Sequence, residues 1–116
     1  MKFRQSLKHP LSKKNQKIIL WVLVNLEVWD PTLPQPRNVL PPPMNVPMLP
    51  DLPNWSWHEY GMRVGFWRIL KALKERKIRS TLALNATVVD HYPETVLAAM
   101  KENWEPMGHG YIQKPM

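Results

Sequence analysis

The chain has 116 residues, a formal net charge of +7 and no cysteine. This length corresponds to one domain and excludes a complete eight-unit (β/α) barrel, which needs roughly 250 residues. Without cysteine the chain cannot form a disulfide framework, a zinc finger or a thiol nucleophile, and we expect a cytoplasmic protein from a reducing compartment.

The positive charge is concentrated at the amino terminus. Residues 1–17 form a basic tail with six lysines and arginines and no acid, so they carry +6 of the +7, and residues 18–116 carry the remaining +1. A nearly neutral domain argues against nucleic acid as a partner. The apolar run after the tail is shorter than the roughly 20 residues of a membrane span, so no membrane partner is expected.

Short apolar segments alternate with amphipathic ones along the rest of the chain. The strands are predicted at 18–25, 80–84 and 104–108, and the helices at 56–77, 86–91 and 93–103. The first strand is apolar on both faces, which is typical of a strand buried inside a sheet. The order β-α-β-α-β predicts an α/β fold with parallel strands and right-handed crossovers.

Two patterns mark the region before the first long helix. Residues 30–54 hold nine of the thirteen prolines, which predicts a long, stiff loop. Such a loop is either a binding loop or assembly arm, or a linker of polyproline II-like conformation. Ser56 and Glu59 have the spacing of a capping box, which predicts that the helix begins at Ser56.

Polar residues stand where each predicted strand ends. These are Asn25 and Glu27, then Asn85, then His109. Taken singly, such an asparagine is usually a turn or cap residue and such a histidine is usually structural. The carboxyl ends of parallel strands form the ligand site in α/β proteins, so their convergence favours a site, with His109 able to act as acid or base.

Aromatic and basic side chains near the ends of the proline-rich segment are candidates for substrate binding. Trp29, Trp57 and Tyr60 can stack on a sugar or a flat ring, although each can equally pack in the core. Arg63, near the start of the predicted helix, can hold an anionic or carbonyl group.

A metal is disfavoured by the donor set. A catalytic zinc ordinarily needs three protein ligands. Glu27 and His109 supply two, and the position four residues after the histidine is Gln113. We therefore expect no cofactor, with Glu27 and His109 as weak candidates for zinc.

Several of these residues belong to strings that resemble one family. The strings are Asn25-Leu-Glu-Val-Trp29, Asp51-Leu-Pro, Trp57-His-Glu-Tyr-Gly-Met-Arg-Val-Gly65-Phe-Trp-Arg68, Ala83-Leu-Asn85, Tyr92-Pro-Glu94 and Gly108-His-Gly110. Together they resemble the polysaccharide-deacetylase (NodB-homology) superfamily across residues 18–112. Within it, the chain is most similar to the metal-independent, allantoinase-like branch.

The resemblance implies a distorted (β/α) barrel that hydrolyses carbon–nitrogen bonds other than peptide bonds. Its substrates would be a small-molecule amide, an N-acetyl sugar or a cyclic ureide. Asn25, Glu27 and His109 would be catalytic, and Trp29, Trp57, Tyr60, Arg63 and Asn85 would bind the substrate. Metal-dependent members have Thr-Phe-Asp-Asp where this chain has Val24-Asn-Leu-Glu27, and a second histidine where it has Gln113.

The family's later strands normally add an arginine, an aspartate and a second histidine, which follow the motif at His109. The resemblance therefore implies that this chain is the amino-terminal portion of an enzyme, inactive by itself, whose full-length form is a homo-oligomer. The alternative is a non-catalytic carbohydrate- or ligand-binding module of the same fold.

Overall fold

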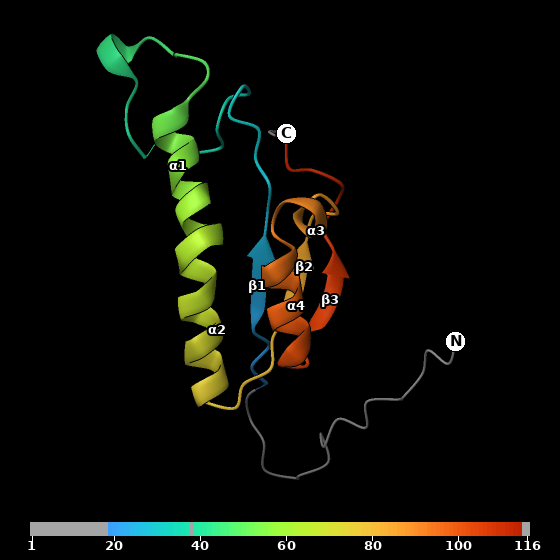
Figure 1. Cartoon of the computed structure of the whole chain (residues 1–116). Helices are drawn as coiled ribbons and strands as arrows, with labels where there is room; N and C mark the ends of the chain where they lie inside the picture. The colour runs from blue at the N-terminus through green and yellow to red at the C-terminus, as the bar shows by residue number, and fades with distance from the viewer. Residues whose placement is uncertain (1–18, 38, 115–116) are drawn as a thin grey trace.

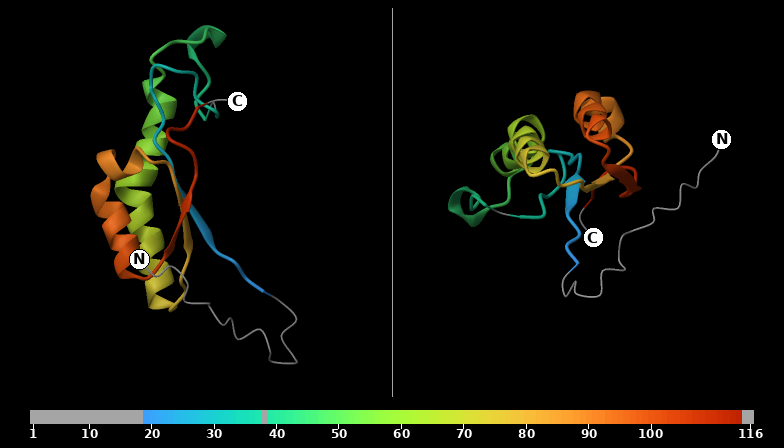
Figure 2. Two further views of the ribbon diagram at one scale, coloured as in Figure 1. Left: turned by 90° about the vertical axis from the view of Figure 1, so that its right-hand side faces the viewer. Right: turned by 90° about the horizontal axis from the view of Figure 1, so that it is seen from below.

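The computed structural model describes residues 19–37 and 39–114, which form a mixed α/β structure with a single open sheet (Figure 1). The elements are β1 (Leu23–Leu26), the 3₁₀ turn η1 (Pro43–Asn45), α1 (Leu52–Tyr60), the π-helical segment η2 (Gly61–Gly65), α2 (Phe66–Glu75), β2 (Thr81–Leu84), α3 (Val88–His91), α4 (Pro93–Lys101) and β3 (Glu105–Gly108). Two turned views show the helices gathered on one face of the sheet (Figure 2).

The three strands are parallel and lie in the order β1-β2-β3. Leu23 pairs with Thr81 of β2, which pairs in turn with Glu105 of β3. The parallel direction and the alternation of strands and helices confirm the α/β prediction. Because all three strands run the same way, their carboxyl ends meet at one rim of the sheet (Figure 1).

β1 is shorter and more exposed than the sequence predicts. The predicted strand covered 18–25, of which residue 18 lies outside the described residues, whereas β1 begins at Leu23. Ile19, Leu20 and Trp21 are 75%, 77% and 68% exposed, so the prediction of a buried strand was wrong there. Within the described part of the chain β1 pairs with β2 alone, and its side chains alternate between exposed and buried.

The core lies between the sheet and the helices. Its buried members come from every layer: Val24, Leu26, Met62, Phe66, Leu82, Val88, Tyr92, Ala99 and Trp104. Phe66 of α2 meets Trp104, just before β3, edge to face with ring centroids 6.1 Å apart. Burial of these apolar side chains fixes the long helical rod α1-η2-α2 against β1 and β2.

The long helix begins four residues earlier than the capping-box pattern predicts. Asp51 is the N-cap, and its carboxylate accepts from the amide of Asn54 at 3.2 Å. Pro53 in the first turn favours this start, since proline suits a position whose N–H has no helical partner. Ser56 lies inside the helix and donates to the Pro53 carbonyl oxygen, while Glu59 pairs elsewhere.

The proline-rich segment behaves as predicted up to that cap. Among its described residues, 30–37 and 39–51 contain no α-helix and no extended strand, and they hold only the 3₁₀ turn η1.

At the other end of the rod, α2 stops at Glu75 instead of Lys77, because Lys77 adopts a left-handed conformation with φ of 56°. The Ile78 amide then donates back to the Leu73 carbonyl at 3.0 Å, a frequent way to end a helix.

Candidate active site

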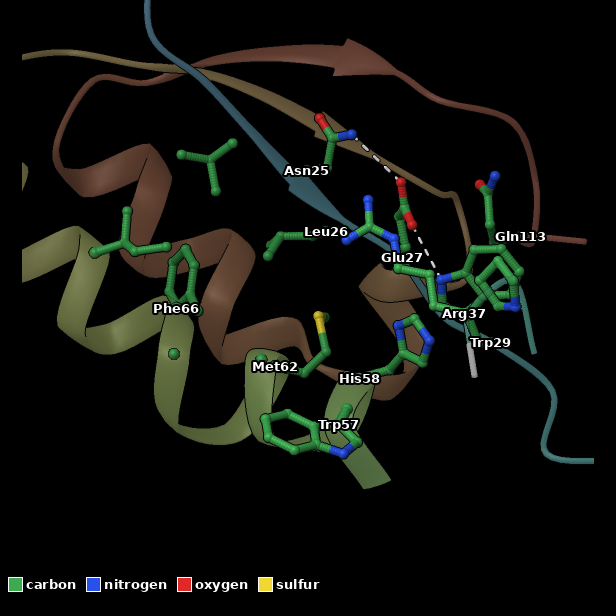
Figure 3. A pocket seen from close by; sticks show the side chains of 15 residues that line it. Asn25, Leu26, Glu27, Trp29, Arg37, Trp57, His58, Met62, Phe66 and Gln113 are labelled. Atoms are coloured by element: carbon green, nitrogen blue, oxygen red, sulfur yellow. Dashed lines mark hydrogen bonds between the residues drawn. The ribbon is translucent and has the colours of Figure 1, made fainter. Parts of the chain in front are cut away.

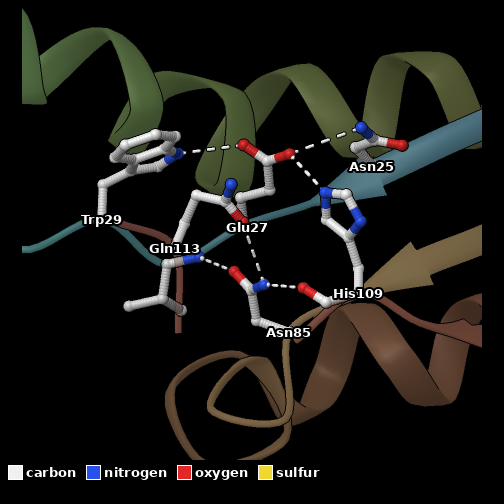
Figure 4. A network of polar contacts seen from close by, with 7 residues as sticks. Asn25, Glu27, Trp29, Asn85, His109 and Gln113 are labelled. Carbon is white, nitrogen blue, oxygen red and sulfur yellow. Dashed lines mark hydrogen bonds and ion pairs between the residues drawn. The ribbon is translucent and has the colours of Figure 1, made fainter. Parts of the chain in front are cut away.

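Three of the predicted site residues meet at the carboxyl rim of the sheet (Figure 4). His109 Nε2 lies 3.0 Å from Glu27 Oε1, although 82 residues separate them in the chain. The Asn85 side-chain amide donates to the backbone carbonyl of His109. The rim therefore brings together residues that follow β1, β2 and β3, as the strand-end rule predicts.

Glu27 is the centre of this cluster. Its Oε1 accepts from Asn25 Nδ2 at 3.4 Å and faces His109, and its Oε2 accepts from Trp29 Nε1 at 3.0 Å (Figure 4). The side chains of Glu27 and His109 are 24% and 35% exposed, so solvent reaches both. The carboxylate is thus held in one orientation and remains accessible.

Asn85 is enclosed by the chain on every side. It is completely buried; its Oδ1 accepts from the Val28 amide at 3.1 Å, and its Nδ2 also donates to Gln113 Oε1 at 3.2 Å. Beyond the end of β2, the backbone amide of Gln113 donates to the Val28 carbonyl at 3.1 Å. Trp29 and Gln113 form a single parallel β-bridge at this point. Asn85 therefore joins the chain that continues β1 to the chain that continues β3.

A cleft of about 560 Å³ opens beside Glu27, between β1 and the rod α1-η2-α2 (Figure 3). Its polar and aromatic lining consists of Asn25, Glu27, Trp29, Arg37, Trp57, His58 and Gln113. Met62, Phe66 and Ile69 supply apolar walls. This volume lies in the range of small-molecule sites, and its mixture of aromatic walls with a few polar groups is typical of them.

His58 and Arg37 are cleft residues that the sequence reasoning missed. The His58 ring stacks on Trp29 with centroids 5.2 Å apart. Burial lowers the pKa of His58; Arg37 acts in the same direction and the Glu27 carboxylate opposes both. The His58 imidazole is therefore neutral at pH 7. Its place directly after Trp57, inside the string that resembles the deacetylases, was the available signal.

Three of the predicted substrate-binding residues lie outside the cleft lining, namely the buried Asn85 and, on the helical rod, Arg63 and Tyr60. Arg63 Nε donates to Glu59 Oε2 at 2.7 Å, and the Tyr60 hydroxyl accepts from Arg68 at 3.0 Å. Glu59 also accepts from the Tyr92 hydroxyl. Burial, followed by this contact with Glu59, raises the pKa of Tyr92 to about 12. Arg63 and Tyr60 thus join networks of their own, whereas Trp29 and Trp57 line the cleft.

The described residues contain no group of three histidine, aspartate or glutamate side chains able to hold a metal ion. Glu27 and His109 remain two donors, and the Gln113 oxygen is used by Asn85. This donor set does not fit a three-ligand zinc site.

None of the helices in the described part of the chain is both long and apolar enough to cross a membrane.

Comparison with known proteins leaves the family open. No family model, no curated protein and no solved structure matches the chain. The likeness to the polysaccharide deacetylases therefore rests on the residue strings alone and stays a prediction.

Proposed function

We propose that the chain supplies the catalytic rim of a hydrolase that cleaves carbon–nitrogen bonds other than peptide bonds, with the described sheet as the amino-terminal part of a distorted (β/α) barrel. The observation that carries the proposal is the contact of 3.0 Å between Glu27 and His109 at the edge of a cleft with aromatic walls. A carboxylate and an imidazole held together can move a proton to and from a reacting group.

The proposed step begins with Glu27, since Glu27 lines the cleft and His109 contacts it from outside the lining. The carboxylate takes a proton from water, and the resulting hydroxide adds to the substrate carbonyl carbon. The carbon–nitrogen bond then breaks, and the leaving nitrogen receives the proton from Glu27. His109 Nε2 orients the Glu27 carboxylate and forms a hydrogen bond with it while Glu27 carries the proton taken from water. Hydrolysis consumes one water; an N-acetyl sugar yields acetic acid and an amine, and a cyclic ureide yields one opened molecule with a carboxylic acid and a ureido N–H.

The remaining cleft residues support binding. Trp29, Trp57 and His58 offer ring faces to a sugar or a flat ureide, and the neutral His58 can donate a hydrogen bond. The guanidinium of Arg37 can donate to the substrate carbonyl, where negative charge develops as hydroxide adds. Asn85 acts as a positioning residue, because its side chain is fully engaged within the rim.

The test combines binding with turnover, using allantoin as the ureide and N,N′-diacetylchitobiose as the N-acetyl sugar. Indole N–H signals of Trp29 and Trp57 should shift on titration with at least one ligand, while that of Trp104, which is 3% exposed in the core, stays in place. Hydrolysis, in this chain or in a longer protein containing it, should fall about 10²–10⁴-fold in Glu27→Gln.

Glu105→Gln makes the same change at the exposed amino end of β3 and is the matched control. Stationary Trp29 and Trp57 signals with both ligands would contradict the proposal. Binding that shifts both signals, without turnover in any protein containing the chain, would favour the second candidate, a non-catalytic carbohydrate- or ligand-binding module. The aromatic lining of the cleft supports that candidate without requiring a proton transfer.

A further inference from the structure

Residues 39–50 of the proline-rich segment form a loop that projects beyond the first turn of α1, away from the sheet, with η1 at its tip (Figure 1, Figure 2). The loop contains no charged residue. Its apolar side chains are nevertheless between 48% and 92% exposed, namely those of Val39, Leu40, Met44, Val46, Met48 and Leu49. Contiguous apolar surface of this kind marks a site where another molecule binds.

The start of this loop has the polyproline II conformation. Leu40, Pro41 and Pro42 each precede a proline, which restricts their backbone to extended conformations. Pro42 has φ of −65° and ψ of 146°, the values of a polyproline II helix. The run ends by Met44, whose φ of 53° reverses the direction of the chain. Residues 40–42 therefore form one turn of this left-handed helix.

A buried side chain holds this turn in place. Asn54, which is 4% exposed, accepts from the Leu40 amide at 2.9 Å and donates to the Leu40 carbonyl at 3.0 Å. Asn54 also donates to the carboxylate of Asp51, the N-cap of α1. The turn is thus attached to the helix before any partner arrives, which lowers the entropy lost on binding.

The chemistry of the turn narrows the class of partner. Because the loop has no charge, a nucleic acid or an acidic peptide gains no ion pair from it. Prolines lack the N–H that a neighbouring strand would need, so the turn cannot extend a β-sheet of the partner. Pro41 and Pro43 are exposed, and polyproline II segments bind grooves that are lined by aromatic side chains.

We propose that residues 40–43 dock into an aromatic-lined groove of a partner protein, with the Pro41 ring between aromatic side chains and the Leu40 side chain against an apolar wall. The Leu40 side chain is available for this contact, because Asn54 engages only its backbone. The proposal is independent of the hydrolase proposal, since none of these residues lines the cleft beside Glu27.

The test titrates the full chain with an isolated WW domain, a small module whose aromatic groove binds proline-rich segments. The amide signals of Leu40 and Met44 should shift until they saturate, while that of Leu82, in the central strand, stays in place. The control probe is the same WW domain with the tryptophan of its groove replaced by alanine, and it should not bind. Absence of a saturable shift with the intact WW domain, or equal binding of both probes, would overturn the proposal.

A pair of variants of this chain localises the contact. Pro41→Ala removes the ring that enters the groove and should weaken binding of the WW domain about tenfold. Pro47→Ala makes the same change at another exposed proline of the loop, outside the polyproline II turn, and should leave the affinity unchanged. Equal effects of the two substitutions would contradict docking through residues 40–43. Concentration-dependent shifts of Leu40 and Met44 without any probe would show instead that a second copy of the chain covers the loop.

Discussion

The rim of the sheet has a closed half and an open half, and the two use similar residues differently. The closed half comprises Asn85, Thr87 and Gly110. The open half comprises Glu27, Trp29 and His109, and His58 of α1 stacks on its Trp29. In the closed half, polar side chains pair with backbone groups and with each other, as Thr87 does with the Tyr111 carbonyl at 3.0 Å. In the open half the pairs leave side chains exposed to solvent or to the cleft.

This difference shows what the end of a strand determines. A residue at the end of a parallel strand lies at the rim. Whether it can bind a ligand depends on whether its polar groups are already paired within the protein. Asn85 and Glu27 both follow a strand directly, yet Asn85 is fully buried and Glu27 lines the cleft. The predictions below separate stability, which we assign to the closed half, from ligand chemistry, which we assign to the open half.

The largest effect on stability is expected for Asn85→Ala. The change leaves the Val28 amide, the His109 carbonyl and the Gln113 oxygen without their partner, and buried groups of this kind are costly to leave unpaired. The free energy of unfolding in urea should fall by about 2–4 kcal/mol. Asn25→Ala, at an exposed position with one contact of 3.4 Å, is the control and should cost less than about 0.5 kcal/mol. Similar losses of unfolding free energy in Asn85→Ala and Asn25→Ala would show that the closed half is no more important for stability than the open half.

Gly110→Ala should rank second. Gly110 has φ of 82°, a region that residues with a Cβ adopt at a cost of about 1–2 kcal/mol. The added Cβ would lie 3.9 Å from Asn85 Nδ2, an ordinary contact, so the loss comes from the backbone alone. Gly108→Ala meets no atom within 4 Å and should change thermal unfolding little. A stable Gly110→Ala protein would show that the closed half tolerates a different backbone.

In the open half, His109→Ala should change the free energy of unfolding by less than about 1 kcal/mol, because it removes one hydrogen bond between side chains that solvent reaches. Its effect on hydrolysis should nevertheless be large, since His109 orients Glu27. Paired measurements of urea unfolding and turnover test this separation. A loss of stability as large as that of Asn85→Ala would place His109 in the closed half.

The smallest effect concerns pH and His58. Burial lowers its pKa below the ordinary 6.5, so as pH falls the unfolded chain takes up this proton before the folded chain does. The stability that His58 contributes is therefore fully present above pH 6.5 and is lost as pH falls through its folded pKa.

The variant that tests this is His58→Phe, which keeps a ring against Trp29. It should reduce the loss of stability between pH 7.5 and pH 5, measured by urea unfolding at each pH. His91→Phe makes the same change at an exposed side chain and serves as the matched control. An unchanged pH dependence in His58→Phe would remove His58 from the groups that titrate on unfolding.

The sequence was informative where a local pattern is sufficient. Strand ends are local, so the meeting of Glu27, Asn85 and His109 could be predicted. The position of a strand within a sheet is not local: the apolar run before Leu23 reads as buried on both faces, yet β1 has a described neighbour on one side only. The sequence shows which side chains are apolar enough to be buried. The order of the strands in the sheet determines which of these side chains are buried.

The helix start and the cleft show the same limit. Ser56 and Glu59 match a capping box, but Asp51 followed by Pro53 caps the helix earlier, and the pattern alone does not rank the two signals. Arg37 lies in a segment with no periodicity to orient it. Its place in the cleft depends on how the proline-rich segment folds back onto α1, which requires contacts distant in sequence.

The π-helical segment η2 has a consequence for how this chain can vary. A π turn holds about one residue more than an α turn, so it is equivalent to a single insertion absorbed within a continuous helix. Gly61 and Gly65 bound the segment and both line the cleft. A homologue one residue shorter here, with α turns in place of η2, could keep Phe66 in the core and Trp57 and His58 at the cleft, because the lost residue is the one that the wide turn absorbs. A deletion of one residue elsewhere in α1 or α2 would instead turn the flanking helices relative to each other by roughly 100° about the helix axis. The π turn is therefore the place where the length of this rod can change while the core and the cleft lining are both kept.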